Sequence, residues 1–192
     1  MGGEGVPPAP IRQSFVRRVF PWERNSLGIS DEVMPPFTPL AVDGPAVSAV
    51  LRRHVHGSAG LWDAVTADDQ PLLAGPMTWE VATADAQGNE QVCPVDGGGW
   101  QVTSAKPNSV SGQAAWSAGP LQAQTLTEYD YDGMLLMTLN LQPTQAAVRR
   151  LSLVVPLRDA AVPYLHAIGD GLRHNYAGFT PAGEGRIWDS SR

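Results

Sequence analysis

The clearest alternation of apolar and polar side chains lies between residues 121 and 157. Apolar residues occupy every odd position from Leu135 to Leu141, while the even positions include the polar residues Thr138, Asn140 and Gln142. This period of two predicts a β-strand with one buried face. After a turn at Pro143, the apolar alternation resumes at residues 151–155, which predicts the next strand of an antiparallel meander.

The Asp-Gly pair at 132–133 predicts a hairpin before this strand. A two-residue turn would place acidic side chains on the apolar face. A three-residue loop over 131–133, with Gly133 in the left-handed conformation, instead pairs Tyr129 with Leu135 and Thr127 with Met137. Because a one-residue slip turns every side chain to the other face, we predict the second register.

Turn signals recur about every 8–12 residues, which is typical of a sandwich or barrel. We therefore predict an all-β fold, an antiparallel β-sandwich of about ten or eleven strands with little or no helix. The expected strands are 15–20, 40–43, 45–56, 61–66, 72–83, 90–95, 100–105, 109–117 and those of the meander.

Two proline- or glycine-rich stretches interrupt this pattern. The stretch 21–40 holds four prolines and is predicted to be an ordered surface loop anchored by Trp22, Leu27, Ile29 and Phe37. The stretch 169–185 is expected to be a long excursion, and 186–188 to begin another strand. We expect a flexible leader at 1–14 and a single sandwich domain at 15–192, cut short at its C-terminal end.

The composition excludes some classes of binding partner. The 192 residues include six tryptophans and 43% hydrophobic residues, which argues against disorder. The net charge of −6 comes without a basic stripe, so we expect neither nucleic acid nor a membrane as partner. No cofactor is predicted. The leader lacks the apolar core of a signal peptide, so the compartment is left open and a secreted or periplasmic parent protein is compatible with it.

His54 and His56 are the metal-ligand candidates, because residues two apart on a strand share a face. A third ligand would come from His166, His174 or a carboxylate, and no spacing identifies one. The ordinary alternative is a pair of histidines on a solvated strand face.

Acidic residues occur as Asp31-Glu32, Asp68-Asp69 and Asp130 with Asp132. Two carboxylates within about 5–10 Å could form a hydrolytic pair. Each of these groups also fits a turn or loop, where Asp accepts local backbone hydrogen bonds. No catalytic residue is assigned.

Aromatic side chains offer two interpretations. Trp100 and Trp116 lie in alternating strands and are expected in the core. Rings in or beside loops could stack on sugars, with polar neighbours binding hydroxyls, or could simply pin the loops to the sandwich. The carbohydrate-contact candidates are Trp22, Trp62, Arg173, His174, Asn175, Tyr176 and Trp188.

Three stretches of the chain carry a family resemblance: PWERNSLGISDEVMPPFTPLAV, LLAGPMTWEV, and VPYLHAIGDGLRHNYAG with the later GEGRIWDSS. In these stretches the chain resembles the N-terminal β-sandwich of glycoside hydrolase family 123-like proteins. The likeness runs from about Val16 to the C-terminus. It implies a parent enzyme with a catalytic (β/α)₈ barrel acting on N-acetylhexosaminides, the substrate's acetamido group serving as nucleophile. The family's Asp-Glu pair lies in the barrel, so Asp31-Glu32 is not matched to it.

The resemblance implies a non-catalytic ancillary domain that packs against a C-terminal catalytic barrel absent from this chain. Its partners would be that barrel and, directly or through it, carbohydrate. Two alternatives stay open: a stand-alone carbohydrate-binding module, and a small metal-dependent β enzyme using His54 and His56.

Overall fold

The computed structural model describes residues 12–85, 87–142, 148–167 and 176–183. The chain divides into two compact units, Met1–Asp31 and Glu32–Arg192. Strands occur only in the second unit, as far as the described residues go. Within those same residues, no helix is both long enough and apolar enough to span a bilayer.

The first unit lacks the edge strand expected at 15–20. Phe15 and Val16 are 88% and 91% exposed, so no buried face offsets the entropy of ordering the backbone. Trp22 stacks on Phe20 with the ring centroids 4.8 Å apart, and Trp22 remains 67% exposed. The strand prediction is therefore wrong.

The anchors expected in the proline-rich loop are exposed in three cases of four. Besides Trp22, the side chains of Leu27 and Ile29 are 86% and 81% exposed, so the prediction is wrong for these three. Phe37 is half-buried and meets the ring of Tyr131 edge-on, with centroids 5.5 Å apart. The prediction is confirmed for Phe37, which belongs to the second unit.

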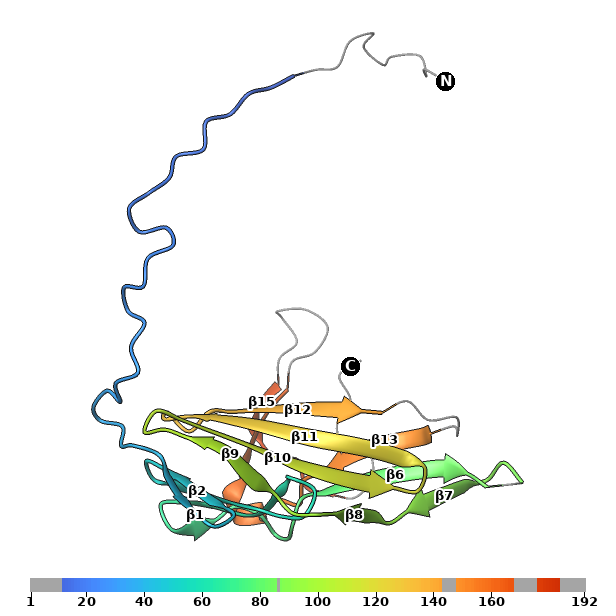
Figure 1. Cartoon of the computed structure of the whole chain (residues 1–192). Coiled ribbons are helices and arrows are strands. Elements are labelled where there is room, and N and C mark those ends of the chain that lie inside the picture. Colours follow the sequence, from blue (N-terminus) through green and yellow to red (C-terminus); the bar gives the residue numbers. More distant parts are fainter. Residues whose placement is uncertain (1–11, 86, 143–147, 168–175, 184–192) are drawn as a thin grey trace, which may run out of the picture. The chain divides into compact units, whose positions relative to one another are not determined.

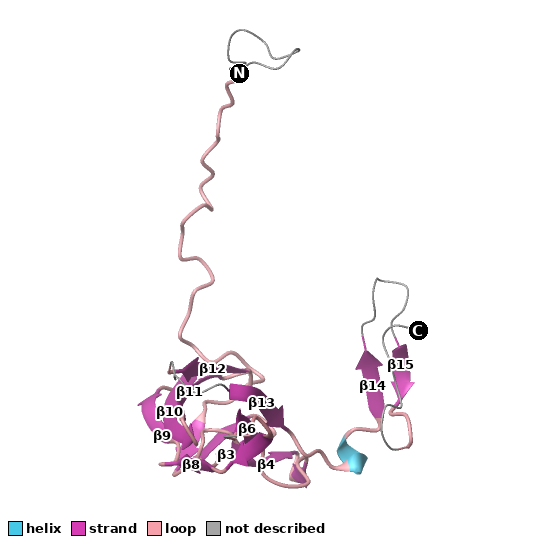
Figure 2. Cartoon of the chain, turned by 90° about the vertical axis from the view of Figure 1, so that its right-hand side faces the viewer, coloured by secondary structure: helices cyan, strands magenta, loops and turns pink. Residues whose placement is uncertain are grey.

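The second unit is all-β, as predicted. Its strands are β1 (Ala41–Asp43), β2 (Ala46–Ala49), β3 (Arg52–His56), β4 (Trp62–Ala67), β5 (Gln70–Pro71), β6 (Thr78–Ala84), β7 (Glu90–Cys93), β8 (Val95–Gly97), β9 (Gln101–Ala105), β10 (Ser109–Ala118), β11 (Leu121–Asp130), β12 (Leu135–Leu141), β13 (Val148–Val154), β14 (Tyr164–Ala167) and β15 (Tyr176–Phe179). A single 3-10 turn, η1 (Asp159–Ala161), is the helical element within the described residues (Figure 2).

The strands form four antiparallel sheets (Figure 1). Their orders are β1-β2-β3-β4-β5, then β12-β11-β10-β8 with β9 also paired to β10, then β13-β6-β7, and the ribbon β14-β15. Side chains of β10 and β11 form one core cluster with β2 and another with β6. The second sheet is therefore one layer of a sandwich, and the first and third sheets make up the other.

The predicted register of the β11–β12 hairpin is confirmed. Tyr129 faces Leu135 and Thr127 faces Met137 across the pair. Gly133 has φ of 87°, and the Asp130 amide donates to the Met134 carbonyl at 3.0 Å. A left-handed glycine closes this three-residue loop because other residues are strained there.

The predicted meander ends one strand early. β13 pairs with β6, not with β12, so that Leu151 faces Val81 and Leu153 faces Trp79. Leu151 does pack on the core, but Leu153 is 44% exposed. Alternation tells which face of a strand is apolar and leaves open which edge that strand joins.

Four further strand predictions need correction. Of the strand expected at 72–83 only the part from Thr78 belongs to β6, and the run 90–95 divides into β7 and β8, which lie in different sheets. The run 45–56 divides into β2 and β3, because a two-residue turn with Leu51 at φ of 57° pairs Ala49 with Arg52. β15 lies inside the expected excursion and pairs with β14. The rest of that excursion, except 180–183, and the strand expected at 186–188 lie outside the described residues. Such divisions raise the strand number above the predicted ten or eleven.

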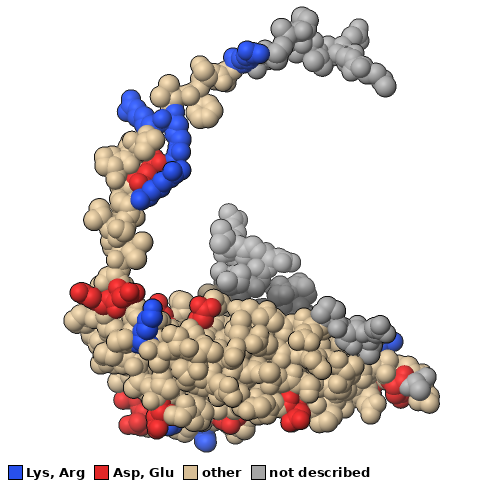
Figure 3. All heavy atoms as spheres, in the orientation of Figure 1, with Lys and Arg blue, Asp and Glu red and all other residues tan. Residues whose placement is uncertain are grey.

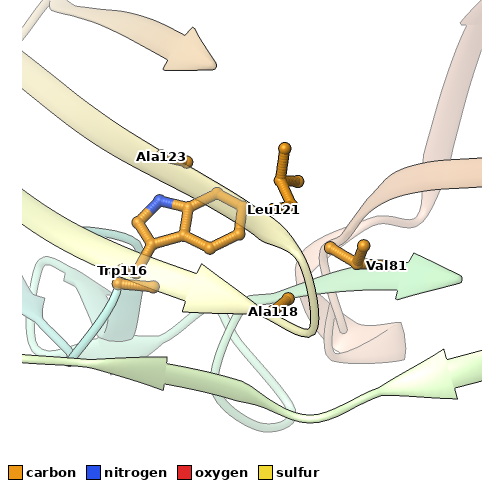
Figure 4. Packing of buried hydrophobic residues seen from close by; sticks show 6 residues of the cluster. Val81, Trp116, Ala118, Leu121 and Ala123 are labelled. Carbon is orange, nitrogen blue, oxygen red and sulfur yellow. The ribbon is translucent and has the colours of Figure 1, made fainter. Parts of the chain in front are cut away.

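The core is built around Trp116, which is 4% exposed (Figure 4). Its ring lies between β10, β11 and β6, beside Val81 and Leu121. Its Nε1 donates to Thr125 Oγ1 at 3.0 Å, and Trp79 stacks on it with centroids 5.7 Å apart. The core position predicted for Trp116 is confirmed, as is that of Trp100, which is 7% exposed.

Candidate functional site

The two histidines of β3 lie inside the sandwich. His54 and His56 are each 4% exposed, and both rings contact Tyr129 of β11. The two side chains share a face of the strand, as predicted. The alternative that this face is solvated is wrong, because both side chains are buried. β3 has β2 and β4 on its two sides, and the β10–β11 layer covers its inward face. We call His54, His56, Trp62, Trp100 and Tyr129 the histidine–aromatic cluster.

A chain of hydrogen bonds fixes the tautomer of His56. Its Nδ1 lies 2.9 Å from the carbonyl oxygen of Gly60, which can only accept, so Nδ1 carries the proton. Nε2 therefore accepts from the Tyr129 hydroxyl at 2.7 Å, and that hydroxyl oxygen accepts from Trp62 Nε1 at 2.8 Å. Both ring nitrogens of His56 are thus used inside the protein.

The environment keeps both histidines neutral. The pKa of His56 is lowered to about 4, mainly by burial; the hydrogen bond to Gly60 opposes this shift and the neighbouring His54 adds to it. Burial also lowers the pKa of His54 to about 4, with Arg52 adding to the effect and a backbone hydrogen bond at Val47 opposing it.

Ring stacking completes the cluster. His56 lies against Trp100 with centroids 4.2 Å apart and planes within 9° of parallel. His54 lies against Trp62 at 4.7 Å. Trp100 Nε1 donates to Thr127 Oγ1 at 2.8 Å. The Nδ1 atom of His54 is buried without a hydrogen-bond partner. The cluster therefore contains one polar atom that neither the protein nor solvent satisfies.

This geometry gives little room for a metal ion. No group of three His, Cys, Asp or Glu side chains that could hold one occurs among the residues that the structure describes. His56 has no ring nitrogen left to coordinate. His166, one of the suggested third ligands, lies on β14, and His174 lies outside the described residues.

The acidic candidates lie on exposed turns and loops. Asp130 Oδ1 accepts from the Tyr131 amide, and Asp132 Oδ1 accepts from the Met134 amide, both at 2.7 Å. Asp68 and Asp69 have φ of 47° and 60° in the turn between β4 and β5. Turn chemistry therefore accounts for four of the six acidic candidates.

The other two acidic candidates and the carbohydrate-contact candidates are dispersed. Asp31 closes the first unit and Glu32 opens the second. Trp62 is half-buried in the histidine–aromatic cluster, and the Tyr176 hydroxyl donates to the Phe179 carbonyl at 2.7 Å. Trp22 belongs to the first unit. The remaining candidates, Arg173, His174, Asn175 and Trp188, lie outside the described residues.

Sequence reasoning missed an outer surface of the β8–β12 sheet. Two adjoining hollows of about 540 and 140 Å³ share Gly98, Ala115 and Gln124. We call their polar lining the amide face; its members are Gln101, Gln113, Gln122, Gln124, Gln142 and Asp96. The signal was the glutamines at alternate positions, such as Gln122 and Gln124, on the side opposite the apolar residues.

Fold and geometry together define a two-layer antiparallel β-sandwich domain, whose buried polar groups hold its layers together. The family model for glycoside hydrolase 123, third domain, matches residues 40–190. The chain belongs to this family, as the resemblance implied. The matched domain is the third of this family, whereas the resemblance was to its N-terminal β-sandwich. No curated protein and no solved structure matches the chain.

Proposed function

We propose that this glycoside hydrolase-related domain is a non-catalytic ancillary domain. Its parent enzyme would act on N-acetylhexosaminides, and the domain would pack against a separate catalytic barrel. The observation that carries the proposal is the saturated hydrogen-bond chain at His56. His56, one of the two buried imidazoles that could serve as an acid or base, has both ring nitrogens committed to structural bonds.

The acidic candidates agree with this proposal. A glycosidase of the two-carboxylate type needs one carboxyl group on each side of the scissile bond. Asp130 and Asp132 instead bind backbone amides of their own loop, and both are exposed. The hydrogen bonds at both ring nitrogens of His56 likewise give no support to a metal-dependent enzyme that uses His54 and His56.

A sheet edge supports the packing against another domain. Among the described residues, β13 pairs with β6 alone, which leaves its other edge unpaired. The four apolar side chains on and after it are 36–46% exposed, namely Leu153, Val154, Val155 and Leu157. Contiguous exposed apolar side chains beside an unpaired edge favour a protein contact.

Activity of the purified chain tests the non-catalytic role. We expect no release of nitrophenol from 4-nitrophenyl N-acetyl-β-glucosaminide or N-acetyl-β-galactosaminide. Turnover that disappears in Asp31→Asn or Glu32→Gln would overturn the proposal, because those two residues form the adjacent Asp-Glu pair of this chain.

Sedimentation of the chain with a catalytic barrel from the same family tests the packing. We expect a complex that Val155→Asp weakens at least tenfold, since a charge would be desolvated at the contact. Val92→Asp is the matched control, because Val92 is a 59% exposed valine on the edge strand β7 of the same sheet. Equal weakening by both variants, or no complex at all, would contradict this part of the proposal.

A further inference from the structure

The amide face has the chemistry of a binding site for a neutral, hydroxyl-rich ligand. It lies on the outer surface of β10 and β11, opposite the layer contact, and its two hollows adjoin at Gly98 and Gln124. Figure 3 shows a broad area over these strands without Lys, Arg, Asp or Glu, with acidic side chains at its lower rim. The face is therefore polar and, across its middle, uncharged.

The lining selects for hydrogen bonding without charge. Each glutamine amide offers two N–H donors and a carbonyl with two lone pairs. A sugar hydroxyl both donates and accepts, so it can bind either end of such an amide. Asp96 is the one charged residue among the described residues that line the two hollows. An anionic ligand would find no cation here, and a cationic one would find a single carboxylate.

Two of the amides hold each other in place. Gln124 Nε2 donates to Gln113 Oε1 at 3.1 Å across the β10–β11 pair. This bond uses one donor of Gln124 and one lone pair of Gln113, and it leaves the other donors and lone pairs of both side chains for a ligand. Because both amides are already ordered, a ligand would face a smaller loss of side-chain entropy on binding.

The backbone of β10 offers no free amides to a ligand, and glycines leave space at one edge of the amide face. β10 is hydrogen-bonded to β11 on one side and to β8 and β9 on the other, so its amides are used in the sheet. The glycines between β8 and β9 interrupt that edge strand. Gly97 contacts the Ser58 carbonyl so closely that a Cβ would lie 2.4 Å from it, whereas a Cβ on Gly98 would meet nothing within 4 Å.

We propose that the amide face binds an uncharged oligosaccharide, with Gln113 and Gln124 as the central hydrogen-bonding pair and Gly98 providing the space. The inference goes beyond the ancillary role, because a glycan bound here would be held whether or not the domain packs on a barrel. None of the residues that line the two hollows was named from the sequence as a carbohydrate-contact candidate.

NMR titration of the full chain tests the proposal. The probes are neutral tetrasaccharides of β-1,4-glucose, β-1,4-N-acetylglucosamine, β-1,4-mannose and β-1,4-galactose, with tetragalacturonate as the charged counterpart. We expect at least one neutral tetrasaccharide to give saturable shifts of the Gln113 and Gln124 side-chain amides. Tetragalacturonate should bind at least tenfold more weakly.

Three variants make the test specific. Gln124→Ala should weaken binding about tenfold through the loss of hydrogen bonds. Gln91→Ala, which removes an exposed amide from β7, should leave binding unchanged. Gly98→Leu should abolish binding by filling the hollow while the melting temperature stays the same, since its Cβ meets no protein atom.

Several results would overturn the inference. They are no saturable shift with any neutral probe, equal binding of tetragalacturonate, or unchanged binding in Gln124→Ala and Gly98→Leu. None of these bears on the ancillary proposal, which the aglycone assay and the sedimentation experiment test separately.

Discussion

At the scale of single residues, the buried hydrogen-bond chain explains why a strand of this sandwich carries two histidines. Tyr129 is 2% exposed and connects three elements, because its hydroxyl group bonds to His56 of β3 and Trp62 of β4. Burying polar atoms is unfavourable unless each finds a partner. Here the partners come from both layers, so the bonds also fix how the layers meet.

Tyr129→Phe should destabilise the protein by about 2 kcal/mol, because it leaves His56 Nε2 and Trp62 Nε1 without their partner. Urea unfolding would measure the change. Tyr131→Phe is the control, because Tyr131 is half-buried against Phe37 and does not belong to the histidine–aromatic cluster. Equal effects of the two variants would contradict the role given to the Tyr129 hydroxyl.

Stability should also fall as the pH drops below about 6.5. The pKa of His54 and His56 is lowered to about 4 in the folded protein, so the unfolded chain binds protons first. The stability that comes from burying the two neutral histidines is fully present above pH 6.5 and is lost as the pH falls toward 4. Between these values each histidine should reduce the free energy of unfolding by about 1.4 kcal/mol per pH unit.

Urea unfolding between pH 7 and 5 checks this, since ordinary carboxylates titrate lower, at about pH 4. His54→Phe keeps a ring beside Trp62 and removes one of the two titrating groups. Its pH dependence should be about half that of the parent chain. An unchanged slope would show that the loss of stability arises elsewhere.

At the scale of elements, close packing between strands depends on glycines, which have no Cβ atom. β10 passes under Trp100 at Gly112, where a Cβ would lie 2.2 Å from the indole ring. Trp100 in turn stacks on His56 and bonds to Thr127. The glycine therefore allows an indole to lie flat over the middle of a ten-residue strand.

Gly112→Ala should destabilise the protein by about 2 kcal/mol or more, because the ring has to move out of its stack and break its hydrogen bond. Near-ultraviolet circular dichroism should show a changed tryptophan signal, and thermal unfolding the loss of stability. Gly98→Ala is the matched control, since its Cβ meets no atom within 4 Å. A silent Gly112→Ala would contradict the packing described for Trp100.

At the scale of the whole molecule, the sandwich is held together by the core between its layers. Trp116 contributes the largest ring in the cluster that joins β10 and β11 to β6. The charged pairs are peripheral by comparison: Arg150 of β13 binds Glu80 of β6 and Glu90 of β7 across an exposed face of their sheet, where solvent weakens the attraction.

Trp116→Ala should destabilise the second unit by about 3–5 kcal/mol through lost burial and the cavity that remains. Trp22→Ala removes the same side chain where it is 67% exposed, and should change the free energy of unfolding by less than about 0.5 kcal/mol. Urea denaturation of both variants gives the comparison. Similar losses would mean that the layer contact is not the main source of stability.

The sequence by itself determined the features that depend on neighbours along the chain. Alternation and the Asp-Gly turn gave the register of β11 and β12, because turn geometry and face burial both constrain it locally. The all-β class followed from the spacing of turns. The family followed from motifs within the chain, and the matched model confirms it.

Only the tertiary structure decided what comes together across the layers. The strand pattern could not show that β13 leaves β12 for β6, because an apolar face is equally satisfied in either sheet. Nor could it show that His54 and His56 are buried, since Tyr129, which accounts for it, is 73 residues away from His56 along the chain. The amide face arises in the same way: its glutamines come from separate strands, and only the pairing of β10 with β11 brings Gln113 beside Gln124.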